Sequence, residues 1–111
     1  MITAPDLPPV ADAGEDLSIT LPTDTAQLDG LKSSDDVEIG AFQWVLTSGS
    51  DDVIMEDQST PVLKLSNLKE GQYEFTLTVV DSNNQTDSDS VVITVTGVHH
   101  FHLVQFMLVI G

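Results

Sequence analysis

Carboxylates are the side chains most able to do chemistry in this chain, in which eighteen Asp and Glu stand against three Lys and no Arg. Two carboxylates act as general acid and general base only when their surroundings hold them in different protonation states. The sequence marks no such pair among its many acids. It also lacks Cys, a Gly-rich phosphate loop and a Gly-x-Ser-x-Gly turn that would present a nucleophile. We therefore predict that the protein is not an enzyme.

The three His residues, His99, His100 and His102, all lie near the C-terminus. His100 and His102 would share one face of a strand, but two ligands are few for zinc, so they would hold the metal only weakly. Segment 98–111, VHHFHLVQFMLVIG, has no formally charged side chain, and its apolar run is shorter than the roughly 20 residues that span a bilayer. We interpret it as a truncated or non-native terminus; an extra edge strand, a partner-binding segment or the start of a transmembrane helix are the alternatives.

Length and charge limit the classes of protein and partner. A chain of 111 residues is about one domain long. Its formal charge of −15 repels phosphate backbones and anionic lipid headgroups, which argues against nucleic acid as a partner and against membrane contact by the domain itself. The first ten residues, MITAPDLPPV, lack the positive and apolar regions of a signal peptide, so we expect any secretion signal to lie in a longer parent protein.

Two alternating runs in the second half of the chain predict an antiparallel β-hairpin. Each run places apolar residues at every second position, which is the period of a half-buried strand. The sequence DSNNQTD between them is rich in the Asp, Asn and Ser that favour turns. The apolar faces comprise Tyr73, Phe75, Leu77 and Val79 in the first run and Val91, Ile93 and Val95 in the second.

Four shorter runs upstream predict further strands, and no window has a convincing helical period. Short strands separated by turn residues are typical of a two-sheet sandwich. We predict an all-β fold, an immunoglobulin-like β-sandwich of two antiparallel sheets with about seven strands and no disulfide. Trp44 is expected in the core between the sheets. The apolar positions of the four runs are Leu17, Ile19 and Leu21; Ala26 and Leu28; Phe42, Trp44 and Leu46; and Leu63, Leu65 and Leu68.

From about Pro8 to Gly97 the chain contains, in this order, the stretches PPVADAGEDLSITLP, AQLDGLKSSDD, FQWVLTSGS and LKLSNLKEGQYEFTLTVVDSNNQTDSDSVVITVTG. In order and spacing, these stretches together resemble a PKD (polycystic kidney disease) domain. The chain is most similar to the tandem PKD repeats of the animal dyslexia-associated membrane proteins, which include the adeno-associated virus receptor, and to repeats of bacterial surface proteins. We therefore divide the chain into an N-terminal linker (1–7), a PKD-like domain (8–97) and the tail (98–111).

One stretch departs from the best-known PKD signature. Many members read Trp-Asp-Phe-Gly-Asp-Gly where this chain has Trp-Val-Leu-Thr-Ser-Gly at positions 44–49. This difference favours the receptor-like subgroup, and it weakens the transfer of properties that depend on the acidic version of the loop.

The resemblance implies a noncatalytic extracellular module, one unit of a larger membrane or secreted protein, that mediates protein or carbohydrate contacts at the cell surface. Neighbouring PKD domains of the parent chain are further expected partners. The alternative is a structural spacer in a tandem array with no ligand of its own. An exposed cluster of aromatic or apolar residues on one sheet would favour recognition, whereas a uniformly polar surface rich in Asp, Ser and Thr would favour the spacer.

Calcium is the one cofactor that the resemblance suggests. Some bacterial PKD domains bind Ca²⁺ through acidic residues of the loop that here contains Asp35 and Asp36, and Asp12 and Asp81 are candidates to join them. Calcium takes six to eight oxygen ligands. The alternative is a solvated acidic turn in which Ser34 or Asp35 caps a local bend of the backbone.

Two loops carry further candidate sites. The segment from Thr47 to Pro61 is long and acidic and contains Val53, Ile54 and Met55, so it is a candidate recognition loop or, alternatively, a short strand that closes the core. In the hairpin turn, Asn84-Gln85-Thr86 forms an N-x-[ST] sequon and a candidate glycosylation site. Its alternative is a polar turn whose Asn residues merely accept left-handed backbone angles.

Overall fold

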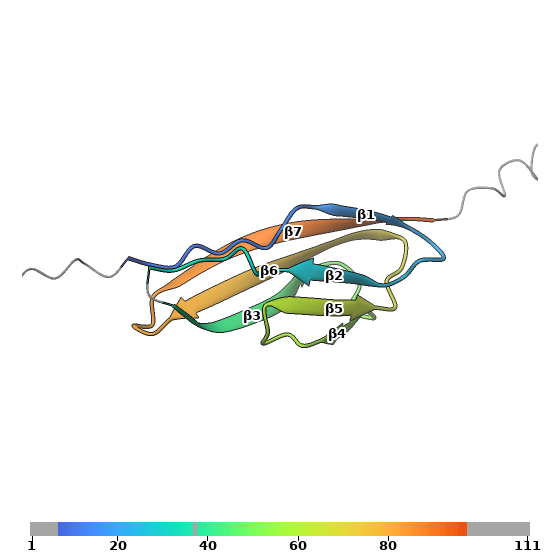
Figure 1. Cartoon of the computed structure of the whole chain (residues 1–111). Coiled ribbons are helices and arrows are strands. Elements are labelled where there is room, and N and C mark those ends of the chain that lie inside the picture. The colour runs from blue at the N-terminus through green and yellow to red at the C-terminus, as the bar shows by residue number, and fades with distance from the viewer. Residues whose placement is uncertain (1–6, 37, 98–111) are drawn as a thin grey trace, which may run out of the picture.

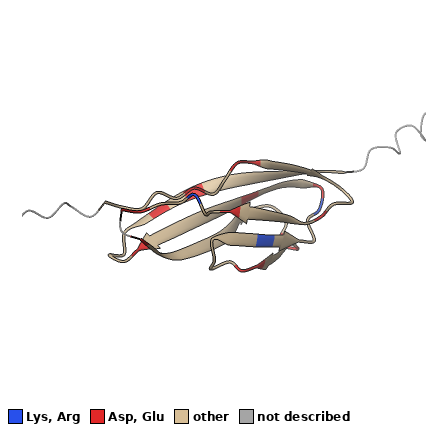
Figure 2. Cartoon of the chain, viewed as in Figure 1, with Lys and Arg blue, Asp and Glu red and all other residues tan. Residues whose placement is uncertain are grey.

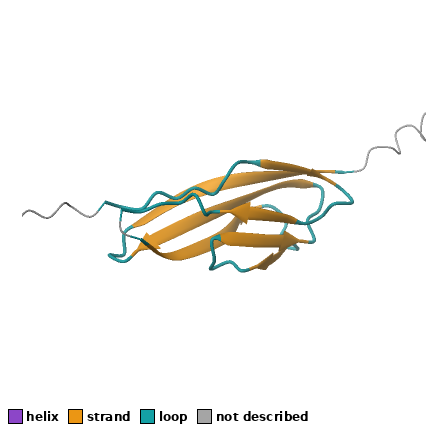
Figure 3. Cartoon of the chain, in the orientation of Figure 1, coloured by secondary structure: helices purple, strands orange, loops and turns teal. Residues whose placement is uncertain are grey.

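The computed structural model describes residues 7–36 and 38–97, and all its regular elements are strands (Figure 3). The tail at 98–111 and most of the linker lie outside the described residues, and so do His99, His100 and His102. Among the described residues no helix is long and apolar enough to cross a membrane. The seven strands are β1 (Leu17–Thr20), β2 (Ala26–Asp29), β3 (Ile39–Ser48), β4 (Ile54–Glu56), β5 (Val62–Ser66), β6 (Gly71–Asp81) and β7 (Thr86–Thr96).

The strands form two sheets, one of four strands in the order β1-β7-β6-β3 and one of three in the order β2-β5-β4 (Figure 1). The chain has no cysteine. The predicted all-β sandwich with about seven strands and no disulfide is therefore confirmed. The predicted hairpin is also confirmed, because β6 and β7 pair antiparallel over ten residue pairs from Gly71–Val95 to Val80–Thr86.

One strand differs from the prediction of two purely antiparallel sheets. Strand β1 runs parallel to β7, with Leu17 opposite Ile93 and Thr20 opposite Thr96. An alternating pattern shows which side chains are buried but not the direction in which the strand runs, and a tight turn dictates an antiparallel pair only for strands that follow each other in the chain. Strands β1 and β7 are the first and last, so only the tertiary fold sets their relative direction.

The core lies between the sheets and is made from the predicted faces. Trp44 has 1% of its surface exposed, and the inward apolar side chains of β6 and β7 are at most 2% exposed. The indole nitrogen of Trp44 donates a hydrogen bond to the carbonyl oxygen of Thr60 at 3.1 Å, which satisfies its one polar group. Burial of an aromatic ring of this size contributes on the order of 2–3 kcal/mol to stability.

A glycine allows the sheets to approach each other beside Trp44. A Cβ atom added to Gly30 would lie 2.7 Å from a methyl carbon of Leu77 and 3.3 Å from the Trp44 ring. The amide of Gly30 also donates to the carbonyl oxygen of Pro61 at 2.8 Å. Position 30 is therefore restricted to glycine by packing rather than by its backbone angles.

Candidate functional site

The four carboxylates of the predicted calcium site lie towards the same end of the sandwich. Asp81 is opposite Ile39 at the start of β3. Asp35 and Asp36 precede that strand, and a bridge between Val10 and Ser34 brings the segment of Asp12 alongside them. These four residues are therefore placed at the same end of the fold, as a shared calcium site would require.

Hydrogen bonds engage most of these carboxylates with backbone amides. Asp81, only 3% exposed, accepts the amides of Asn83 and Gln85, both at 2.9 Å, and so organises the β6–β7 turn. Asp12 accepts the amide of Gly14 at 2.9 Å, and Asp36 accepts that of Leu7 at 3.2 Å. Within the described chain, no three acidic, His or Cys side chains form a group that could hold a metal ion. Calcium binding stays a prediction.

Two carboxylates of β7 hold the N-terminal segment, residues 8–16, against the four-stranded sheet. Asp87 accepts a 2.8 Å hydrogen bond from the amide of Ala11, and Asp89 accepts one of the same length from the amide of Ala13. Both acidic side chains are half-buried. Hydrogen bonds to a charged acceptor are stronger than those between neutral groups, so these two bonds fasten the segment to the sheet.

These contacts continue the register of the parallel strand pair. The residues of each bond are 76 positions apart, which is also the separation of Leu17 and Ile93 where β1 pairs with β7. The carboxylate of Asp16 accepts the amide of Val92 at 2.9 Å with the same separation. Side-chain oxygens thus extend the parallel ladder upstream of β1.

The sequence prediction assigned no role to Asp87 and Asp89, although the pattern contained a signal. They lie four and two residues before Val91, on the face of β7 that Val91 and Ile93 bury. An acidic side chain at a core-facing position needs a hydrogen-bond partner, because burial of an unpaired polar group is costly. Acidic residues at the core-facing positions of an alternating strand therefore predict that another segment of the chain donates hydrogen bonds to them.

The outward side of the four-stranded sheet carries a network of hydroxyl groups. Thr76 lies 2.9 Å from Ser90 and 3.2 Å from Thr47, oxygen to oxygen, and Thr78 lies 2.8 Å from Ser88. We name this surface the hydroxyl face; its members are Thr47, Thr76, Thr78, Ser88, Ser90 and Thr94. Acids occur on both sheets and on the loops (Figure 2). The same side of the four-stranded sheet also carries Glu74, two residues before Thr76 in β6, and Val45, which is opposite Thr76.

The predicted recognition loop contains a short strand, as its alternative interpretation expected. Val53 is 9% exposed and Met55 packs against the core, whereas Ile54 between them is 50% exposed. Strand β4 covers Ile54–Glu56 and pairs with β5. Val53 and Met55 of this loop therefore pack against the core of the sandwich, whereas Ile54 is exposed to solvent.

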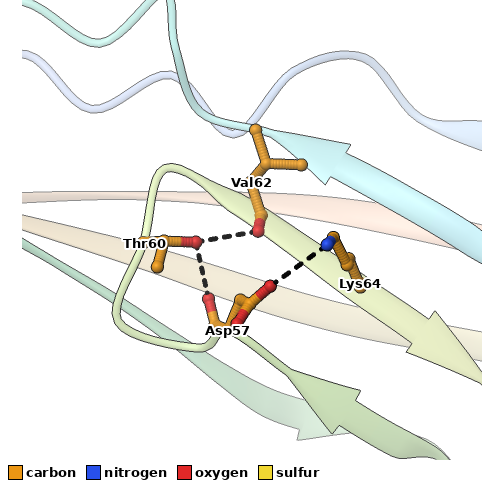
Figure 4. A network of polar contacts seen from close by, with 4 residues as sticks. All are labelled: Asp57, Thr60, Val62 and Lys64. Atoms are coloured by element: carbon orange, nitrogen blue, oxygen red, sulfur yellow. Dashed lines mark hydrogen bonds and ion pairs between the residues drawn. The ribbon is translucent and has the colours of Figure 1, made fainter.

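A turn after β4 is organised by Asp57 and Thr60 (Figure 4). The Thr60 hydroxyl contacts the carbonyl oxygens of Asp57 and Val62, both at 2.9 Å. The Asp57 carboxylate lies 3.4 Å from the Lys64 ammonium, and both side chains are about half exposed. An exposed ion pair contributes at most about 1 kcal/mol, so the hydroxyl bonds define this turn more than the charges do.

The same turn covers the open edge of β3. The amide of Trp44 donates to the carbonyl oxygen of Gln58 at 2.8 Å. Strand β3 has no charged residue in its ten positions, and such edges invite pairing with other chains unless something blocks them. The bond to Gln58 blocks the middle of this one.

Exposed apolar side chains are dispersed over the described surface. The large ones are all aliphatic and lie at the end of the linker, on the N-terminal segment, on the loop after β2, on β3 and on β4: Leu7, Val10, Leu31, Val45 and Ile54. Among the described residues, no aromatic side chain is one of the exposed large hydrophobics.

Comparison with known proteins identifies the family. The family model described as "K319L-like, PKD domain" matches residues 13–95. The chain is 46% identical over 90 residues to human low-density lipoprotein receptor-related protein 11, and 45% identical over 94 residues to the mouse dyslexia-associated protein KIAA0319 homolog. These alignments cover 81% and 83% of this chain but only 18% and 9% of the two relatives.

A solved structure agrees in both sequence and fold. The solution structure of the PKD domain from KIAA 1837 protein superposes with a TM-score of 0.76 at 43% identity, and the match covers 80% of this chain and 87% of that one. The resemblance seen in the sequence is thereby confirmed. The chain belongs to the K319L-like PKD domain family.

Proposed function

We propose that this domain is a noncatalytic spacer in the extracellular part of a larger cell-surface protein, where it holds neighbouring PKD domains apart. The observation that carries the proposal is the course of the chain, which arrives beside the start of β7 and leaves after its end (Figure 1). Strand β7 has eleven residues, and a strand rises about 3.3 Å per residue, so the two points lie roughly 33 Å apart. Each domain would thus add its length to an array.

The pairing of the first and last strands suits such a role under tension. The N-terminal segment and β1 run parallel to β7, so a pull on the two ends loads their hydrogen bonds in shear. Bonds loaded in shear share the force and break together, whereas bonds pulled open from one end break in succession. The carboxylate bonds of Asp87 and Asp89 lengthen the interface that would bear this load.

Single-molecule stretching of identical tandem copies of the chain tests the proposal. Replacement of Asp87 and Asp89 by Ala should lower the unfolding force, because it removes two bonds from the loaded interface. Forced unfolding depends on the unfolding rate, which such bonds slow. The matched control replaces Asp51 and Asp52, which are exposed and far from this interface in the fold, and should leave the force unchanged. Equal forces for the parent and the Asp87/Asp89 variant would count against the proposal.

Recognition of a protein or carbohydrate at the cell surface is the second candidate function, and the hydroxyl face supports it. Uncharged hydroxyls on a chain of charge −15 would let a partner approach without meeting concentrated negative charge. The relatives also include a receptor-related protein. Affinity capture from cell-surface extracts, with the parent compared with a Thr76→Lys variant, tests this candidate, since a long charged side chain at the centre of the face would block contact.

Replacement of the acidic residues in the Thr47–Pro61 loop provides a separate test of whether the domain recognises a partner. Replacement of Asp51, Asp52, Glu56 and Asp57 by Asn and Gln should leave folding intact, because all four are exposed and the ion pair that Asp57 makes with Lys64 is weak. Unchanged capture of a partner by this variant would show that the charge of the loop is not the recognition element.

A further inference from the structure

The tip of the β6–β7 hairpin presents an asparagine side chain to solvent. Asn84 is exposed and has a φ of 65°, and its amide donates to the carbonyl oxygen of Asp81 at 3.1 Å. Val80 and Thr86 form the last pair of the hairpin below it. The buried carboxylate of Asp81 holds this turn from within, so the outward orientation of position 84 is built into the fold.

A second left-handed asparagine gives an internal comparison. Asn67 has a φ of 60°, and its side-chain amide donates to the carbonyl oxygen of Asp52 at 2.9 Å. The side chain of Asn84, by contrast, makes no hydrogen bond to any residue of the described chain. Asn67 is followed by Leu68 and Lys69, whereas Asn84 begins the N-x-[ST] sequence that ends at Thr86. The one free asparagine of the pair is therefore the one with the sequon.

We propose that Asn84 carries an N-linked glycan when the parent protein passes through a secretory pathway that glycosylates. The side-chain amide nitrogen of Asn84 would attack the anomeric carbon of an oligosaccharide linked to a polyprenyl pyrophosphate. A carbon–nitrogen bond forms as the bond from that carbon to the pyrophosphate oxygen breaks, the lipid pyrophosphate leaves, and the amide gives up one proton to the transferase.

The position of the glycan follows from the fold. The β6–β7 turn lies at the end of the sandwich where the N-terminal segment joins it (Figure 1), since Ala11 bonds to Asp87 just beyond the turn. A glycan at Asn84 would stand beside the junction with any preceding domain and limit how far that domain tilts. This consequence rests on the proposed spacer function, whereas the modification needs only the secretory pathway.

Intact-mass measurement of the full chain tests the site, after secretion from an animal host behind an added signal sequence. The parent should carry a mass that an N-glycosidase removes, and the release should leave Asp at position 84 in the peptide map. Asn84→Gly removes the acceptor but tolerates the positive φ, and Thr86→Val removes the hydroxyl but keeps a β-branched residue at the strand start. Both variants should lack the glycan.

Two results would overturn the proposal: a folded, secreted parent without glycan, or a variant that keeps one. Circular dichroism of the same fractions verifies folding. Cell-free translation with microsomal membranes reads the modification as a gel shift without any need for secretion. Loss of the glycan signal and loss of the shear-dependent unfolding force are independent results, so failure of the site and failure of the spacer role can be told apart.

Discussion

The phenolic oxygen of Tyr73 accepts a 2.8 Å hydrogen bond from the amide of Lys69, four residues earlier in the chain. Tyr73 is 2% exposed and lies near the start of β6, so this bond ties the β5–β6 connection to the core. The arrangement is the tyrosine corner of immunoglobulin-like sandwiches. It explains how a chain without disulfides fixes one of the connections between its two sheets.

Tyr73→Phe should destabilise the domain by about 1 kcal/mol. The substitution keeps the ring and its packing but leaves the part-buried amide of Lys69 without an acceptor. Urea unfolding followed by tryptophan fluorescence measures the change through the lone Trp44. An unchanged midpoint with an unchanged m-value would mean that water replaces the lost oxygen without cost.

Asp89→Ala should cost about 1–3 kcal/mol, because it removes a charged acceptor from the half-buried amide of Ala13. Asp51→Ala is the matched control; its side chain is exposed, so the change should stay within about 0.5 kcal/mol. Thermal or chemical unfolding of the two variants gives the comparison. If both lose the same stability, general charge effects rather than the fastened N-terminal segment explain the result.

Substitution of two glycines by alanine distinguishes the energetic cost of backbone strain from that of steric overlap. Gly49 and Gly71 have φ values of +120° and +136°, where other residues are strained by about 1–3 kcal/mol. A Cβ atom at position 49 would also lie 2.8 Å from the Tyr73 ring, whereas one at position 71 meets nothing within 4 Å. Gly49→Ala should therefore be the more destabilising substitution in chemical denaturation. Equal losses would show that the Tyr73 ring and the backbone at Gln72, whose carbonyl oxygen would lie 3.0 Å from the added Cβ atom, both adjust without cost.

Calcium titration distinguishes the two interpretations of the acidic end. A site built from Asp12, Asp35, Asp36 and Asp81 predicts saturable heat and a higher melting temperature at moderate salt, where screening suppresses nonspecific binding. The alternative, a solvated acidic turn capped by Ser34 or Asp35, predicts neither effect, and Asp12, Asp36 and Asp81 already accept hydrogen bonds from backbone amides. Heat that disappears in an Asp36→Asn variant would instead establish the calcium site.

Much of the fold could be predicted because the signals for it are local. Alternation at every second residue showed the buried faces of β6 and β7, and the lone Trp44 was assigned to the core correctly. The turn at Asn84 followed from its Asp, Asn and Ser content. Each of these properties depends on side-chain direction within one strand or turn, which neighbouring residues alone determine.

The tertiary structure decided what depends on residues far apart in the chain. The parallel direction of β1, the bonds from Asp87 and Asp89 to amides 76 residues earlier, and the covering of the β3 edge by Gln58 all join distant segments. The sequence alone does not show whether an acidic side chain in a strand is surrounded by water or accepts a hydrogen bond from a backbone amide. Folding excludes water and brings the donor within 3 Å, and only then does the hydrogen bond to such an acid stabilise the sandwich.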